Sequence, residues 1–189
     1  YNISNRVYFF NRIYFMSGHN KWSQIKNQKG ATDKKRGQLF SKLVRAISIA
    51  AKTEPNPQFN PRLRSAIEKA EENSVPKDNI ERAVNKAGEE KNLEDIMIEA
   101  YGPEGSAIII EGITDSKNRA ISEIKHILTG QGGKIANPGS VLWNFEKSDT
   151  GWVAKFPQKI SDSAKEKIQQ LIIALEEHED VQQVTTNIN

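Results

Sequence analysis

The chain contains no cysteine among its 189 residues. This absence excludes a disulfide framework, a thiolate metal site and a thiol nucleophile. No apolar run approaches the roughly 20 residues that a membrane-spanning helix needs. The hydrophobic fraction of 37% and the charged fraction of 27% are typical of a globular protein with a substantial core. We therefore expect a cytoplasmic protein without a membrane partner.

Acidic residues are almost missing from the first 53 positions, where Asp33 stands alone against eleven Lys and Arg side chains. Residues 1–53 therefore carry a net charge of +10. Residues 54–189 hold 16 basic and 23 acidic side chains, a net charge of −7. A chain divided in this way is expected to present its basic end to a polyanion.

The first 15 residues form a leader of doubtful origin. They contain Arg6 and Arg12, lack acids and are rich in Tyr, Phe and Asn. This composition resembles an organellar transit peptide, which would make the protein mitochondrial. Because the chain starts at a tyrosine and Met16 precedes a well-formed segment, we favour a non-native or upstream-translated leader on a cytoplasmic protein.

A helical domain is predicted over residues 16–88. Apolar residues recur at three- and four-residue steps over residues 37–52, which indicates one amphipathic helix. A second helix is expected to start at Asn60-Pro61, a side-chain cap followed by proline in the first helical position. A third is expected to start near Pro76. These three helices would follow directly on the basic segment.

A different pattern begins at residue 89. Apolar runs and turn signals indicate strands alternating with two helices. The expected elements are strands over 96–101 and 107–113, a helix over 117–129, strands near 140–145 and 152–156, a helix starting at a capping box at Ser163, and a strand over 181–188. This order predicts an α+β domain over residues 89–189, with a mainly antiparallel sheet and helices packed on one face.

The basic segment supplies the candidate contacts. Spaced lysines can neutralise successive phosphates and release their counterions, and an exposed tryptophan can stack on a base. For Trp22 the alternative is that it packs the segment onto the helices while the lysines stay solvated. The side chains expected to contact nucleic acid are Lys21, Trp22, Lys26, Lys29, Lys34, Lys35, Arg36, Lys42 and Arg45.

Catalytic and cofactor motifs are not evident. The glycines before Lys134 superficially resemble a phosphate loop, but they follow a helix and no Ser or Thr follows the lysine. The three histidines are widely separated in the sequence, which argues against a metal site. Asp115 is interpreted as a helix cap, and Arg119 and Glu123 as an i,i+4 ion pair. We expect no enzymatic activity, no cofactor, no metal and no small-molecule substrate.

Several motifs occur in a characteristic order along the chain: Gly18-His19, Lys21-Trp22, Lys35-Arg36, Asn60-Pro61-Arg62-Leu63-Arg64, Pro76-Lys77-Asp78-Asn79-Ile80, Tyr101-Gly102-Pro103 and Gly139-Ser140-Val141. In these motifs the chain resembles the YebC/PmpR family, which includes mitochondrial translational activators of cytochrome oxidase subunit I. The resemblance runs from about Ser17 to Phe145 and resumes over the final helix and strand.

The resemblance implies a helical N-terminal domain followed by α/β domains, and a role in the regulation of gene expression. Bacterial members are described as DNA-binding transcriptional regulators. Other members imply an RNA-associated role in translation, with ribosomal RNA and the ribosome as partners. A protein-interaction adaptor with a basic arm is a third alternative.

The chain departs from the family pattern at two places. Asn20 stands where serine usually follows the Gly-His pair, which keeps a short polar side chain. Family members also carry an additional α/β subdomain before the last helix, whereas only Pro157–Ile160 bridge that interval here. We therefore expect a fold shortened by one subdomain.

Overall fold

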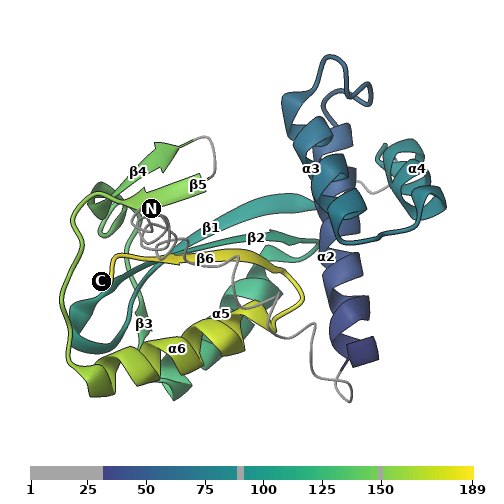
Figure 1. The fold of residues 1–189 in the computed structure, drawn as a ribbon. Coiled ribbons are helices and arrows are strands. Elements are labelled where there is room, and N and C mark those ends of the chain that lie inside the picture. The colour runs from purple at the N-terminus through teal and green to yellow at the C-terminus, as the bar shows by residue number, and fades with distance from the viewer. Residues whose placement is uncertain (1–31, 89–91, 149–150) are drawn as a thin grey trace, which may run out of the picture.

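The structure is a computed structural model that describes residues 32–88, 92–148 and 151–189, with side chains from Lys35 onward. Three helices stand beside an α+β domain (Figure 1). None of the helices in these ranges is long and apolar enough to cross a membrane.

The helical domain consists of α2 (Thr32–Ala51), α3 (Pro61–Glu72) and α4 (Lys77–Lys86). Asn60 caps α3 as predicted, since its side chain accepts a hydrogen bond from the Leu63 amide at 3.0 Å. The same side chain donates to the Ala50 carbonyl at 2.8 Å and so ties the end of α2 to the start of α3. Apolar residues of all three helices share one core.

The sheet of the second domain has four strands in the order β3-β1-β2-β6, and every neighbouring pair is antiparallel. Its strands are β1 (Glu94–Tyr101), β2 (Ala107–Thr114), β3 (Lys134–Ile135) and β6 (Val181–Thr186). The single-turn helix η1 (Pro103–Gly105) joins β1 to β2. The predicted α+β fold with a mainly antiparallel sheet is confirmed.

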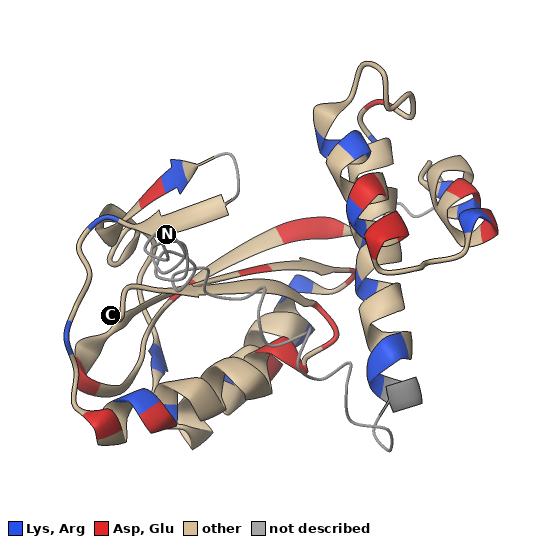
Figure 2. Cartoon of the chain, in the orientation of Figure 1, with Lys and Arg blue, Asp and Glu red and all other residues tan. Residues whose placement is uncertain are grey.

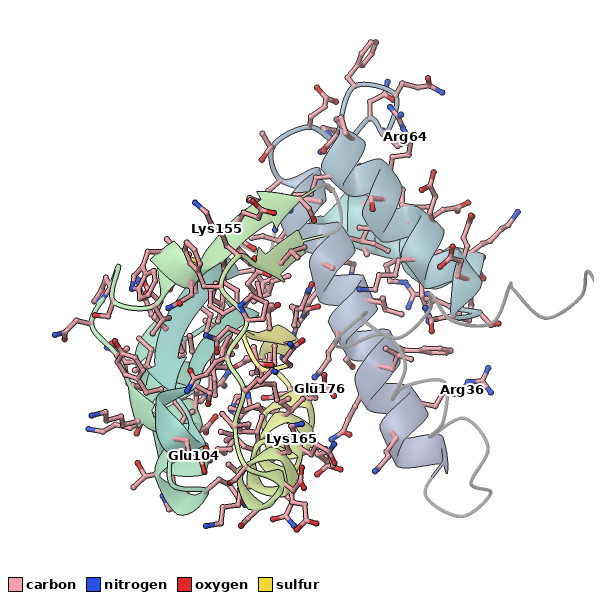
Figure 3. All side chains as sticks on the ribbon, turned by 60° about the vertical axis from the view of Figure 1, so that its left-hand side comes forward. Arg36, Arg64, Glu104, Lys155, Lys165 and Glu176 are labelled. Carbon is pink, nitrogen blue, oxygen red and sulfur yellow. The ribbon has the colours of Figure 1, made fainter. Side chains whose placement is uncertain are left out.

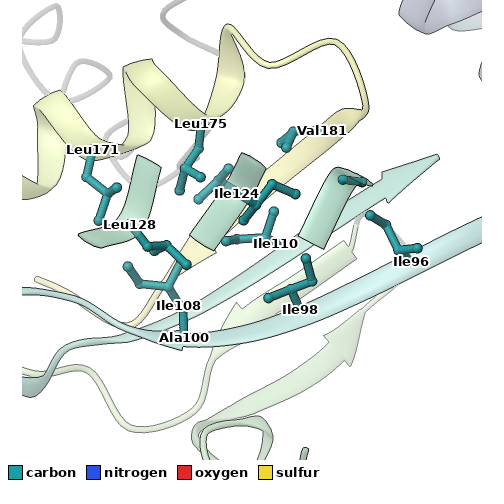
Figure 4. Close-up of a cluster of buried hydrophobic side chains, with 12 residues drawn as sticks. Ile96, Ile98, Ala100, Ile108, Ile110, Ile124, Leu128, Leu171, Leu175 and Val181 are labelled. Carbon is teal, nitrogen blue, oxygen red and sulfur yellow. The ribbon is translucent and has the colours of Figure 1, made fainter. Parts of the chain in front are cut away.

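Both faces of this sheet are covered. Helices α5 (Lys117–Gly130) and α6 (Asp162–Glu176) pack on one face, where Ile124, Leu128, Leu171 and Leu175 meet the strands (Figures 1 and 4). A hairpin of β4 (Phe145–Ser148) and β5 (Gly151–Ala154) packs through Phe145 and Trp152 against the other face. The central strand β2 is accordingly apolar at consecutive positions.

The structure corrects three local predictions. Residues 142–144 form the single-turn helix η2 (Leu142–Asn144) instead of part of a strand. Helix α6 is capped by Ser161, whose hydroxyl accepts from the Ala164 amide at 3.2 Å, and not by a capping box at Ser163. Asp115 does not cap α5, where the N-cap position is occupied by Ser116; it pairs with Arg119 at 2.9 Å.

The glycines that resemble a phosphate loop end a helix, as expected. Helix α5 stops at Gly130, and Gly132 has a left-handed φ of 76°, a conformation that favours glycine. The Gly133 amide donates to the Leu128 carbonyl at 2.8 Å, which closes the turn. The chain then enters β3, so no helix follows to complete a phosphate site.

Candidate nucleic-acid interface

Four predicted contact residues, Lys21, Trp22, Lys26 and Lys29, lie outside the described residues. The side chain of Lys34 lies outside them as well, although its backbone belongs to the first turn of α2. Their role stays a prediction.

Arg36 occupies the free end of α2. Its side chain is exposed, and the guanidinium carbon lies 5.1 Å from the centroid of the Phe40 ring. In Figure 3 the side chain projects from α2 away from the sheet domain. Within the described part of the chain it pairs with no carboxylate. No carboxylate of the described residues therefore competes with an external anion for this cation.

Three other predicted contact residues face the second domain instead. Lys35, Lys42 and Arg45 are separated by seven and three positions, which places them on one side of α2. They meet the C-terminal end of α6 and the turn that leads to β6. We call this contact the interdomain clasp: Lys35, Lys42 and Arg45 with Glu176, Glu177, Glu179 and Asp180.

Lys42 is the most buried cation of the clasp, with 6% of its surface exposed. Its ammonium donates to the Glu176 carbonyl at 2.5 Å, and Glu176 lies between α2 and α6 in Figure 3. The last carbonyls of a helix carry partial negative charge and favour a cation there. Burial nevertheless lowers the pKa of Lys42 to about 8, against the opposing effect of the nearby Glu176 carboxylate. Such burial is not what we expected for a phosphate contact.

Asp180 lies at the centre of the clasp and is fully buried. Its carboxylate accepts from Arg45 at 2.6 Å, from Arg119 at 2.8 Å and from the Thr114 hydroxyl at 3.1 Å. Its backbone carbonyl accepts from the Ile113 amide at 2.8 Å. One side chain thus joins α2, α5 and the end of β2.

Sequence analysis did not find Asp180, although a signal for it existed. The segment 176–180 reads Glu-Glu-His-Glu-Asp at the C-terminal end of a helix, and a stretch this acidic complements the basic face of α2. Lys35 pairs with Glu177 at 3.1 Å, and Arg45 lies 3.8 Å from Glu179. Part of the charge contrast between the two halves of the chain is therefore used inside the molecule.

Two further contacts hold the domains together. Arg62 of α3 forms a two-pronged ion pair with Asp95 of β1, at 2.9 and 2.6 Å. Lys52, which follows α2, donates to the Leu93 carbonyl at 2.8 Å. Both residues lie off the apolar stripes of the helical domain and contact the second domain. Figure 2 shows Lys and Arg positions in blue along α2 and α3.

A group of possible metal ligands adjoins the clasp. One ligand atom each from Glu123, His178 and Asp180 lies within 4.8 Å of the others, a convergence that the spacing of the histidines did not predict. The His178 ring nitrogen lies 2.8 Å from Glu123, however, and both Arg45 and Arg119 contact Asp180. Two guanidinium groups at this carboxylate disfavour a further cation.

A second buried carboxylate organises the loop that carries the Gly139-Ser140-Val141 motif. Glu99 of β1 accepts hydrogen bonds from the backbone amides of Gly139, Val141 and Leu142, the last two at 2.7 and 2.9 Å. Burial alone would raise the pKa of Glu99, but these three donors hold it below its ordinary value. The motif is thus explained by support of the fold.

Fold and interface define a protein in which a basic helical domain is fastened to an α+β domain by ion pairs, with the buried carboxylate of Asp180 at their centre. Residues 20–90 match the family model for the TACO1/YebC protein N-terminal domain, and residues 93–150 match the model for the TACO1/YebC second and third domain. The chain belongs to the TACO1/YebC family, as its motifs predicted.

Named relatives and a solved structure agree with this assignment. A "Probable transcriptional regulatory protein" from Desulfosudis oleivorans is 46% identical over 165 residues, covering 85% of this chain and 64% of the relative. One of the same description from Petrotoga mobilis is 51% identical, covering 70% and 54%. The crystal structure of a conserved hypothetical protein, Aq1575, from Aquifex aeolicus matches with a TM-score of 0.78 and 31% identity, over 89% of this chain and 96% of that one.

The chain therefore spans less than two thirds of the length of these curated relatives. Seven residues separate β5 from α6 in this chain. This is the interval in which we expected a family subdomain to be missing.

Proposed function

We propose that this protein is a nucleic-acid-binding, non-enzymatic regulator of gene expression that holds phosphates with its basic segment and the free end of α2. Arg36 carries the proposal, because its guanidinium is exposed and unpaired within the described residues and continues a nearly acid-free sequence. The relatives described as transcriptional regulatory proteins support the same function.

The expected phosphate contacts divide into two groups. Lys21, Lys26, Lys29, Lys34 and Arg36 would bind phosphates, with Trp22 stacking on a base. Lys35 could exchange its surface partner Glu177 for a phosphate, since such a pair contributes little stability. Lys42 and Arg45 would instead orient α2, because both are engaged by the second domain.

DNA is the first candidate ligand, because the names of the relatives refer to transcriptional regulation. An RNA-bound factor that assists translation on the ribosome is the second candidate, and one observation supports it. Reading a DNA sequence takes a helix that presents Arg, Asn or Gln to base edges. On α2 the Arg45 guanidinium is engaged by Asp180, so few such groups remain. Recognition by backbone and shape, which is common for RNA, fits this helix.

Binding is tested by the salt dependence of affinity. Replacing Lys34 and Arg36 with alanine should weaken binding and reduce the slope of log affinity against log salt by about 1.8 for duplex DNA, or about 1.4 for a single strand. Arg64→Ala, an exposed arginine on α3, serves as the control. Unchanged affinity and slope in the double variant would refute the phosphate contacts.

Crosslinking the full chain to its ligands and sequencing the bound nucleic acid separates the two candidates. Promoter DNA among the reads would support transcription, and ribosomal RNA would support translation. Partners that survive nuclease treatment while no nucleic acid is recovered would identify a protein adaptor and overturn the proposal.

A further inference from the structure

Two exposed aromatic rings lie side by side next to the β4–β5 hairpin. Trp143 is 62% exposed and Phe156 is 50% exposed, and their ring centroids are 5.8 Å apart with an interplanar angle of 46°. We call this pair the aromatic patch. In Figures 1 and 3 the hairpin lies toward the opposite end of the molecule from the free end of α2.

The rings are held in place by the backbone around them. The Trp143 indole N–H donates to the Ser140 carbonyl at 2.9 Å. The amides of Lys155 and Phe156 both donate to the Asn144 carbonyl, at 2.7 and 3.3 Å, which joins the two parts of the patch. Rings fixed before a ligand arrives lose little conformational entropy on binding.

One cation borders the patch, because the Lys155 ammonium lies 5.4 Å from the centroid of the Phe156 ring. A second lysine, Lys147, lies further along the hairpin, with its ammonium 5.7 Å from the centroid of the half-buried Trp152 ring. Neither lysine forms an ion pair among the described residues. Over residues 143–160 the sequence has three lysines against Glu146 and Asp149, in a half of the chain that is otherwise negative.

We propose that Trp143 and Phe156 stack on unpaired bases of a single-stranded nucleic acid while Lys155 meets an adjoining phosphate. Exposed rings with interleaved cations are how proteins bind single strands without reading their sequence. In a duplex the faces of the bases are already stacked on one another, so the two aromatic rings find no base on which to stack. This second contact rests on the proposed nucleic-acid function and adds an unpaired strand to it.

The charges also argue against a second copy of the chain as the occupant. A two-fold symmetric dimer with its axis at this patch would bring the cations of the two copies together. Lys155 of one copy would then lie near Lys155 of the other, a repulsion between like charges. A phosphate between stacked bases removes the same repulsion.

The test compares single strands with a duplex, using the full chain. Affinities for a 12-nucleotide oligo(rU), for oligo(dT) of the same length and for a 12-base-pair duplex are measured by fluorescence anisotropy at several salt concentrations. The double variant Trp143→Ala, Phe156→Ala should lose at least about tenfold in affinity for the single strands, with an unchanged salt slope and unchanged duplex affinity. A larger loss on one single strand than on the other would identify RNA or DNA as the preferred source.

Two control variants separate stacking from damage to the fold. Val153→Ala alters another exposed apolar side chain of the hairpin, 45% exposed, and should leave binding unchanged. Trp143→Phe keeps an aromatic face and should retain most of the affinity. Equal affinity of the double variant and the parent for single strands would overturn the proposal. So would an equal loss on the duplex, or a dimer of the parent protein that the double variant abolishes.

Failure of this proposal and failure of the phosphate contacts give different results. If Arg36→Ala leaves every affinity and slope unchanged while the patch variant loses single strands, the contact by α2 is wrong and the patch stands. If the Arg36 variant changes the slope and the patch variant binds all three probes normally, only the patch is refuted.

Discussion

The N-terminal end and the middle of α2 carry similar cations in opposite situations. At the free end the Arg36 guanidinium is exposed over Phe40. Further along, Lys42 and Arg45 are covered by the second domain and engaged by a helix carbonyl and by Asp180. Positive charge in a sequence therefore does not by itself mark a binding surface. What decides is whether the folded chain supplies the counter-charge from a distant segment.

The largest loss of stability is expected from a substitution at Asp180, at the centre of the interdomain clasp. Asp180→Asn keeps the shape of the side chain but removes the charge shared by Arg45 and Arg119. Breaking a buried ion pair in this way costs about 3–5 kcal/mol. We expect a loss of that size in the free energy of unfolding, measured by urea denaturation at pH 7.

The matched control is Asp95→Asn. Its partner Arg62 forms an equally short pair, but both side chains are more than half exposed. An exposed pair contributes no more than about 1 kcal/mol. If the two variants lose the same stability, burial of the clasp is not what makes it important.

Glu99 provides a second buried carboxylate for comparison with Asp180, because its partners are backbone amides instead of arginines. Glu99→Gln places an amide group against three donors and should cost about 3 kcal/mol at pH 7. Glu94→Gln, an exposed position on the same strand, is the control and should be nearly neutral.

The pH dependence of the Glu99 effect has a definite sign. The pKa of Glu99 is lower in the folded protein than in the unfolded chain. The stability it provides is therefore complete above the unfolded pKa of about 4.3, and it is lost as the pH falls through the folded value. The stability difference between parent and Glu99→Gln should shrink from pH 5 toward pH 2. A constant difference across this range would contradict the assignment.

The contribution of Lys42 to the clasp can be tested by the pH dependence of stability above pH 8. Its folded pKa of about 8 lies below the unfolded value, so the unfolded chain binds more protons between the two and stability rises with pH there. Lys42→Met removes this rise, which amounts to about 2 kcal/mol between pH 8 and 10.4. Urea denaturation across that range measures it, with the exposed Lys69→Met as control. An identical alkaline rise in parent and Lys42→Met would show that Lys42 is not the group responsible.

Local signals in the sequence predicted most of the fold. Asn60-Pro61 marked the start of α3 because a cap and an N1 proline act within one turn. Helix α2 begins at Thr32, five residues before the expected Gly37, because its first turn has no apolar residue to show periodicity. Strand β3 escaped prediction because two residues are too short for an alternating pattern.

What failed depended on distant partners. Residues 140–145 contain an apolar run that favours a strand, but the carboxylate of Glu99 in β1 binds the amides of Val141 and Leu142. Likewise, Lys42 and Arg45 lie off the apolar stripe of their own domain, a position that by itself favours contact with solvent or a ligand. Their partners lie more than 130 residues away along the chain. The apolar stripe of a helix indicates which side packs in the core of its own domain. It does not indicate a polar side that a second domain covers.

The smallest expected effects come from a comparison of Arg36→Ala with Arg45→Ala. Arg36→Ala should change the free energy of unfolding by no more than about 0.5 kcal/mol, since the side chain is exposed. It should nevertheless lower the salt slope of nucleic-acid binding by about 0.7–0.9, the contribution of one phosphate contact. Arg45→Ala should do the reverse and lose at least about 1 kcal/mol of stability with an unchanged slope, because its charge is already bound to Asp180. Urea denaturation and anisotropy titrations on the same two variants measure both quantities. If both arginines changed the slope equally, α2 would contact phosphates along its length, and the clasp would have to open when the ligand binds.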